Sequence, residues 1–243
     1  MCACAEGKRE FCDRTAYMPE VQQILILEDI MSIKGVIFDL DGVLVFTDKF
    51  HYQAWKKMAD GMGIYFDEVI NNRLRGVSRM ASLDIILERY EGEPLSPEQK
   101  EALAEQKNKM YRELLATMTY ADVTDDVRST LAELRRRGYK LAVGSSSKNA
   151  KFILERTGLT DAFDRVSDGT NITHSKPDPE VFLKAAEYIG EEPASCLVVE
   201  DAESGIDAGN AGGMQTAAIG DAVNCGRAAY NINSVADLLE ILK

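Results

Sequence analysis

The chain has 243 residues, of which 45% are hydrophobic and 28% are charged. A chain of this length buries roughly 70 to 75% of its extended surface on folding, so we expect one large domain or two unequal ones with a sizeable core. This composition excludes disordered, collagen-like and low-complexity proteins. The formal net charge of −12 at pH 7 also argues against a protein that binds the nucleic-acid backbone, because such binding needs a basic surface.

The sequence has no segment typical of a membrane or secreted protein. No stretch approaches the roughly 18 apolar residues that cross a bilayer, and the first ten residues lack the basic region and apolar run of a secretory signal. We therefore expect no membrane contact and a cytoplasmic location. The five cysteines are odd in number and show no paired CxxC spacing, which favours reduced thiols over a disulfide framework.

The first predicted element is a buried strand. Gly35–Phe38 is a short apolar run that ends in Asp39-Leu40-Asp41-Gly42, which is typical of a buried strand that delivers carboxylates to the loop at its carboxyl end. We assign residues 32–46 to a core domain that begins with this strand. Residues 1–31 mix charge, cysteine and one apolar run, and we treat them as an N-terminal extension.

A helical region follows. Residues 47–120 have a helical pattern throughout, with Trp55 and Ala59 at helical spacing and a second long run over Glu98–Ala116. Ser78 is a good N-cap for one of the helices. Because this region lies between the first strand and the rest of the core, we predict an inserted α-helical cap domain.

After residue 120 the chain alternates between helices and strands. The predicted elements are a helix at 124–137, a strand at 140–143, a helix at 148–157, a strand at 165–167, a helix at 179–189 and a strand at 196–199. Right-handed crossovers place such strands parallel in one sheet, with the strand-end loops on one edge. We therefore predict an α/β fold, in which residues 121–243 complete a Rossmann-like parallel sheet with helices on both faces.

Polar segments follow several predicted strands. They are Asp39–Gly42, Gly144–Asn149, Ser175–Pro179 and Glu200–Asp201. Carboxylates supply the hard oxygen ligands that Mg²⁺ prefers, and serines with backbone N–H groups at a helix start can hold phosphate oxygens. Lys176 can neutralise charge on a transferring group. The four segments together predict a phosphoryl-transfer site.

The order and spacing of these segments resemble those of the haloacid dehalogenase-type phosphotransferases. Within that superfamily the chain resembles the β-phosphoglucomutases, and the resemblance runs from about residue 33 to the C-terminus. The residues that carry it are Asp39-Leu40-Asp41-Gly42-Val43-Leu44, Thr47, His51, Trp55, Gly76-Val77-Ser78-Arg79, Ser145-Ser146-Ser147-Lys148-Asn149, Lys176-Pro177 and Glu200-Asp201.

The resemblance implies a role for each of these residues. Asp39 would be the nucleophile, Asp41 the general acid and base, and Ser145 and Lys176 further catalytic groups. Mg²⁺ would be held by Asp39, Asp41, Glu200 and Asp201. The substrate would be bound by Thr47, His51, Trp55, Gly76, Val77, Ser78, Arg79, Lys107, Ser146, Ser147, Lys148 and Asn149.

The implied activity is a Mg²⁺-dependent interconversion of β-D-glucose 1-phosphate and β-D-glucose 6-phosphate. It would proceed through an aspartyl-phosphate and β-D-glucose 1,6-bisphosphate, which is both intermediate and primer. The expected partner is thus a small sugar phosphate, and we expect a monomer. A haloacid dehalogenase-type sugar phosphatase and a noncatalytic sugar-phosphate sensor are the alternatives, although intact Asp39 and Asp41 argue against a sensor.

Three positions in the cap region or just before it leave alternatives open. Trp55 fits an anchor of the cap core as well as a sugar contact, and His51, one helical turn before it, has a structural reading too. Phe46 stands where the superfamily often has a second Asp, a departure that could alter how the cap moves.

Overall fold

The computed structural model of the protein describes residues 32–74 and 77–243. Residues Ile33–Lys243 form one compact unit. The predicted extension, residues 1–31, and Gly76 lie outside the described residues. No helix in the described ranges combines the length and apolarity that a membrane crossing would require.

The core is a parallel sheet of six strands, which confirms the predicted fold class. Its strands are β1 (Gly35–Phe38), β2 (Lys140–Gly144), β3 (Arg165–Ser167), β4 (Cys196–Glu200), β5 (Gln215–Ala218) and β6 (Tyr230–Asn231), in the order β3-β2-β1-β4-β5-β6. β1 lies between β2 and β4, and Gly35 is in register with both Lys140 and Cys196. The loop after β1 therefore lies in the middle of the sheet edge.

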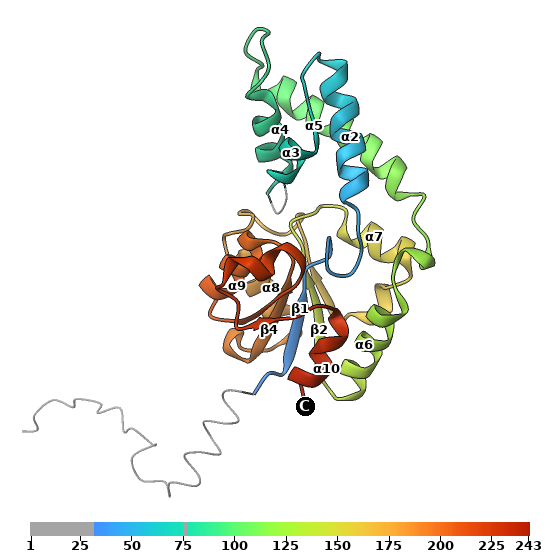
Figure 1. Ribbon diagram of the computed structural model, residues 1–243, viewed down its shortest axis with the longest axis vertical. Coiled ribbons are helices and arrows are strands. Elements are labelled where there is room, and N and C mark those ends of the chain that lie inside the picture. Colours follow the sequence, from blue (N-terminus) through green and yellow to red (C-terminus); the bar gives the residue numbers. More distant parts are fainter. Residues whose placement is uncertain (1–31, 75–76) are drawn as a thin grey trace, which may run out of the picture. The chain divides into compact units, whose positions relative to one another are not determined.

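Side chains of the central strands alternate between two apolar layers, as a parallel sheet covered on both faces requires. Val36 and Phe38 pack in one cluster with helices α6 (Asp125–Arg136) and α7 (Ala150–Thr157). Ile37 packs in the other cluster, to which α8 (Glu180–Ile189) and α9 (Glu203–Ala211) contribute. Figure 1 shows α6 and α7 on one side of the strands and α8 and α9 on the other.

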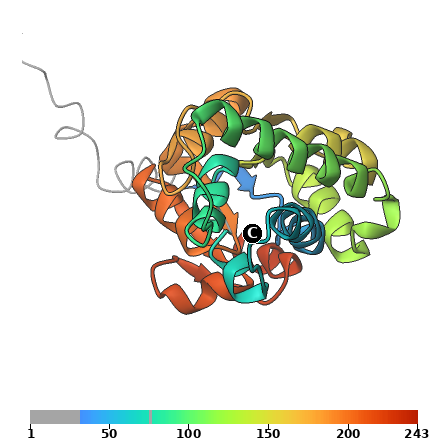
Figure 2. The same cartoon turned by 90° about the horizontal axis from the view of Figure 1, so that it is seen from above.

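Between β1 and α6, the described residues form four α-helices. They are α2 (Asp48–Gly61), α3 (Glu68–Asn72), α4 (Arg79–Leu87) and α5 (Pro97–Leu115). These helices share an apolar cluster of their own, which includes Trp55, Phe66 and Leu83. Figure 2, which looks down on them, shows α2 almost end-on and the long α5 (green) beside it.

The C-terminal part of α5 belongs to the core. Tyr111 and Leu115, together with Met118 just beyond the helix, are buried in the same cluster as Phe38 and α7. α5 thus packs against the helices before it at one end and against the sheet layer at the other.

The remaining elements are short. α10 (Leu238–Ile241) closes the chain, and 3₁₀ turns cover Tyr120–Asp122, Thr160–Ala162, Pro193–Ser195, Gly220–Cys225 and Val235–Asp237. The helix predicted at 148–157 begins two residues later, at Ala150, because Lys148 and Asn149 belong to the turn that precedes it.

Candidate active site

The loop after β1 is a tight turn that directs Asp39 into the sheet edge. The Asp39 N–H donates to the Val199 carbonyl of β4 at 2.9 Å, and the Gly42 N–H donates to the Val45 carbonyl at 2.7 Å. Gly42 has φ +86°, a conformation that favours glycine. A Cβ at this position would overlap the carboxylate of Asp201. The glycine therefore allows the loop to approach the end of β4.

Lys176 lies between two carboxylates. Its Nζ is 2.5 Å from Asp39 Oδ1 and 2.5 Å from Glu200 Oε1, and all three residues are buried. Burial opposes the charge of Lys176, but the charges of Asp39 and Glu200 outweigh it and raise the pKa of Lys176 above its usual value. The ammonium stays protonated beside the predicted nucleophile.

Asp39, Glu200 and Asp201 form a carboxylate cluster whose ligand atoms lie within 4.8 Å of one another. Burial raises the pKa of Asp201 to about 8, and the charges of Glu200 and Asp39 add to this effect. Burial also raises the pKa of Glu200. Both shifts come first from burial, which disfavours the charged carboxylates, and hard carboxylate oxygens gathered in such a place suit a divalent cation such as Mg²⁺.

Asp41 lies outside that cluster. Its Oδ1 accepts a hydrogen bond from the Thr47 hydroxyl, which in turn accepts one at 3.1 Å from the Tyr111 hydroxyl of α5. Burial, with the Asp39 charge, raises the pKa of Asp41 to about 7. A carboxyl group with this pKa can both give and take a proton near neutral pH.

A cationic side chain of α5 reaches the same region. Lys107 is buried, its Nζ lies 3.0 Å from His51 Nδ1, and it stands over the rings of Trp55 and Tyr111 at 4.4 and 4.5 Å from their centroids. Burial and the Arg79 charge lower the pKa of Lys107 to about 7. Burial and the Lys107 charge also hold the pKa of His51 well below its ordinary value, so His51 is a neutral ring beside Lys107. Trp55 itself is part of the apolar cluster of the cap helices.

Arg79 begins α4. The Ser78 hydroxyl caps this helix by accepting from the Ala81 N–H at 3.2 Å, as its sequence position predicts. Arg79 Nη1 lies 3.2 Å from Glu105 Oε2 of α5, and Val77 is half-buried just before the cap. The neighbouring Gly76, also predicted to bind substrate, is outside the described residues.

The predicted phosphate loop follows β2. The Ser145 hydroxyl accepts from the Ser147 N–H, and the Ser147 hydroxyl accepts from the Asn149 N–H, both at 3.2 Å. Among the described residues the buried hydroxyl of Ser146 has no hydrogen-bond partner, while Lys148 is exposed. The side chain of Asn149 turns away from the loop to α5.

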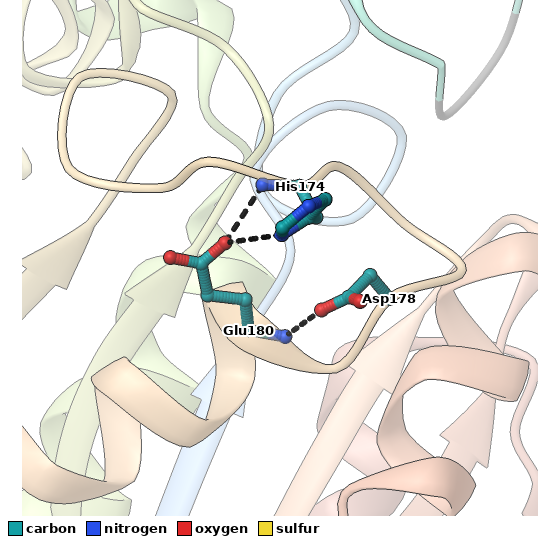
Figure 3. Close-up of side chains that lie close together, drawn as sticks. All are labelled: His174, Asp178 and Glu180. Carbon is teal, nitrogen blue, oxygen red and sulfur yellow. Dashed lines mark hydrogen bonds and ion pairs between the residues drawn. The ribbon is translucent and has the colours of Figure 1, made fainter.

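The structure also has a cavity beside Asp201 and a second cluster of possible metal ligands. A cavity of about 520 Å³ opens beside Asp201; it is lined by Asn72, Pro177, Asp201, Ala202, Glu203, Ser204, Asp207 and Asp221. Figure 3 shows a second group of possible metal ligands, His174, Asp178 and Glu180. Its carboxylates are occupied, because Glu180 accepts from the N–H groups of Thr173 and His174 and pairs with Lys184, and Asp178 accepts from the Glu180 N–H. We interpret it as an anchor for the loop that carries Lys176.

Sequence reasoning missed several polar residues of α5 that reach this region. Tyr111 supports Thr47, and Glu105, Asn108 and Arg112 contact Arg79 or Asn149. The signal for Tyr111 was present in the sequence, since it stands four residues after Lys107 and therefore on the same helix face. No comparable signal distinguishes the other three residues from the ordinary charged face of a solvated helix.

Comparisons with known proteins show the family to which the chain is related. Residues 33–213 match a family model described as haloacid dehalogenase-like hydrolase. The chain is 39% identical over 189 residues to the β-phosphoglucomutase of Bacillus subtilis (strain 168), which covers 77% of this chain and 84% of the relative. It is 33% identical over 181 residues to the fructose-1-phosphate phosphatase of Escherichia coli (strain K12), with 74% and 93% covered.

Solved structures show the same relationship. The crystal structure of β-phosphoglucomutase from Clostridium difficile superposes with a TM-score of 0.80 at 37% sequence identity, and covers 85% of this chain and 93% of that one. The family match spans most of the chain, and Asp39, Lys176, Glu200 and Asp201 lie together at one sheet edge. The chain therefore belongs to the haloacid dehalogenase-like hydrolases.

Proposed function

We propose that this protein is a Mg²⁺-dependent β-phosphoglucomutase that interconverts β-D-glucose 1-phosphate and β-D-glucose 6-phosphate. The observation that carries the proposal is the buried Asp39 carboxylate, which is held by Lys176 beside Glu200 and Asp201. The identity of 39% to the Bacillus subtilis β-phosphoglucomutase supports the choice of substrate.

In the proposed reaction Asp39 carries the phosphoryl group. The 6-hydroxyl of β-glucose 1-phosphate attacks the phosphorus of phospho-Asp39 while Asp41 takes the hydroxyl proton, which forms the 1,6-bisphosphate and frees the carboxylate. The bisphosphate turns round, and the 1-phosphoryl group moves to Asp39 while Asp41 returns its proton to the sugar oxygen. The products are glucose 6-phosphate and phospho-Asp39, so each cycle conserves the phosphoryl group and the proton.

Other groups would stabilise this transfer by position and charge. Lys176 neutralises charge on the aspartate and on the phosphoryl oxygens, and catalysis of this kind depends mostly on positioning and electrostatics. Asp39, Glu200 and Asp201 would hold the Mg²⁺, which supplies further positive charge at the phosphoryl oxygens. Asp41 was also predicted as a metal ligand, but its bond to Thr47 and its raised pKa favour the acid–base role. Arg79 and the loop 145–149 would hold the phosphate that is not reacting.

The assay that tests the proposal supplies β-glucose 1-phosphate, Mg²⁺ and a trace of the 1,6-bisphosphate, and measures glucose 6-phosphate and free phosphate separately. We expect glucose 6-phosphate to be the main product. Release of mostly free phosphate would identify a sugar phosphatase instead, an outcome with a precedent in the relative from Escherichia coli.

The nucleophile is tested in the same assay with Asp39→Asn, which keeps the shape of the side chain and removes its charge. We expect turnover to fall by more than about 10³-fold, with no comparable loss in Asp161→Asn, a change at an exposed aspartate of the core. Substantial residual activity in Asp39→Asn would overturn the assignment.

A further inference from the structure

Helix α5 holds the last residue of the loop 145–149. Asn149 is 5% exposed, and its carboxamide bridges to two residues of α5: Arg112 Nη1 donates to Asn149 Oδ1 at 3.1 Å, and Asn149 Nδ2 donates to Asn108 Oδ1 at 3.0 Å. Asn108 and Arg112 are four residues apart and therefore lie on one face of the helix. The two contacts match the carboxamide, because a donor meets its oxygen and an acceptor meets its nitrogen.

In this arrangement the side chain of Asn149 does not cap its own helix, α7. Asn149 is the N-cap residue of α7, a position where Asn normally accepts a hydrogen bond from the first turn of its own helix, yet its side chain makes no such bond here. A buried amide needs partners, and in this protein both partners come from a helix about 40 residues earlier in the chain.

Arg112 is further held on its second side. Its guanidinium stacks over the Phe152 ring of α7, 4.4 Å from the centroid, so it contacts both the N-cap residue and the first turn of the same helix. Arg112 is otherwise exposed. The fold therefore does not depend on the burial of this side chain.

We propose that Arg112 is a positioning residue of the active site: with Asn108 it clamps the Asn149 carboxamide and so fixes the loop 145–149 against α5. The inference rests on the proposed phosphate-binding function of that loop. The bond to Asn108 uses one of the two N–H groups of the Asn149 carboxamide, so the clamp orients this side chain as well as the backbone of the loop. The same helix carries Lys107, so one rigid element positions both a cation and the phosphate loop.

The first test measures the clamp without relying on activity. Hydrogen–deuterium exchange of the full chain is compared for wild type, Arg112→Ala, Arg112→Lys and the control Lys109→Ala, an exposed change on the same helix. We expect Arg112→Ala to speed exchange of the amides at 147–152 by about tenfold, since the bond from a charged donor is lost, with Arg112→Lys between it and wild type. Unchanged exchange at 147–152 would overturn the clamp, whatever the protein catalyses.

The second test asks whether the clamp acts on the ligand. With β-glucose 1-phosphate we expect Arg112→Ala to raise KM several-fold with little change in kcat, and guanidinium ion added to the buffer to lower that KM again. In an Asn149→Ala background Arg112→Ala should have no further effect on KM. Faster exchange with an unchanged KM, or additive effects of the two substitutions, would contradict the positioning role. A wild-type chain that is inactive would instead refute the proposed function and leave the exchange result to decide the clamp.

Discussion

At the scale of single residues, the main feature of the candidate site is the unequal number of buried acidic and basic groups. Asp39, Glu200 and Asp201 lie together at one sheet edge, and the buried ammonium of Lys176 pairs with the first two of them. Moving a carboxylate out of water is costly, so burial raises the pKa of Asp201, and the charges of Glu200 and Asp39 raise it further. On the cap side the imbalance is reversed, because Lys107 is buried near Arg79 and its pKa falls to about 7.

The low pKa of Lys107 predicts a pH dependence of kcat/KM. The groups that face Lys107 are His51 and Trp55 of α2, Arg79 of α4, Tyr111 of α5 and Asp41 of the loop after β1. Because Lys107 loses its proton as the pH rises through about 7, we expect kcat/KM for the sugar phosphate to fall on that side. Lys107→Arg should move this fall upward by more than about one pH unit, since arginine stays protonated, and Lys107→Met should remove it.

The same group predicts a pH dependence of stability. The pKa of Lys107 is lower in the folded chain than its ordinary value of 10.5, so between these values the unfolded chain holds a proton that the folded chain has lost. The free energy of unfolding therefore receives a contribution that rises from pH 7 to 10, and denaturant titrations should show this rise reduced in Lys107→Met. An equal fall of kcat/KM in wild type and Lys107→Arg, or an equal rise in stability in Lys107→Met, would contradict this account.

At the scale of elements, the loop after β1 is the part of the site most dependent on backbone geometry. Gly42 combines φ +86° with a close approach to the Asp201 side chain. Gly213, in the turn that follows α9, also has a positive φ, +73°, but nothing lies near the place where its Cβ would be. A comparison of substitutions at the two glycines therefore distinguishes the effect of backbone strain from the effect of crowding the Asp201 carboxylate.

Alanine substitution at the two positions is therefore expected to differ. Both Gly42→Ala and Gly213→Ala should lower the free energy of unfolding by about 1 to 3 kcal/mol, because a non-glycine residue is forced into the left-handed region. Only Gly42→Ala should also weaken Mg²⁺ binding, measured by calorimetry, and reduce turnover. If Gly42→Ala kept the metal affinity of Gly213→Ala, Asp201 would not hold the ion.

At the scale of the whole molecule, α5 joins the two parts of the site. Its side chains meet the loop after β1 through Tyr111 and Thr47, and the loop after β2 through Arg112 and Asn149. Its C-terminal turn is buried in the core cluster. Any movement of the cap helices relative to the sheet must accordingly preserve or break these contacts.

Metal binding should register as stability of the whole chain. A cation that binds only the folded protein stabilises it by about 2.7 kcal/mol at a concentration one hundred times its Kd, and here it would also relieve repulsion among the buried acids. We expect Mg²⁺ to raise Tm by several degrees in wild type and in His174→Ala, which lies in the second cluster, and to leave the Tm of Asp201→Asn nearly unchanged. If Mg²⁺ no longer raised the Tm of His174→Ala, the ion would bind at His174, Asp178 and Glu180 and not at the cluster proposed here.

The sequence alone determined the sheet-and-helix alternation and pointed to the sheet edge at which the candidate site lies. Apolar runs that end in acids mark β1 and β4, since a buried strand needs a continuous apolar pattern and its polar residues then fall at the loop. The positions of Asp39 and Glu200 at the sheet edge follow from this pattern. β5 was missed because Gln215–Ala218 has only small or polar side chains, which lack the bulky apolar signal of a strand.

Only the tertiary structure decided which residues of α5 enter the site. Asn108 and Arg112 stand in a charged helix and show no local difference from their solvated neighbours, because their partner Asn149 is about 40 residues away in sequence. The raised pKa of Asp41 and the lowered pKa of Lys107 likewise depend on burial and on charges from other elements. Local pattern encodes periodicity and strand ends, whereas long-range contacts and desolvation exist only once the chain has folded.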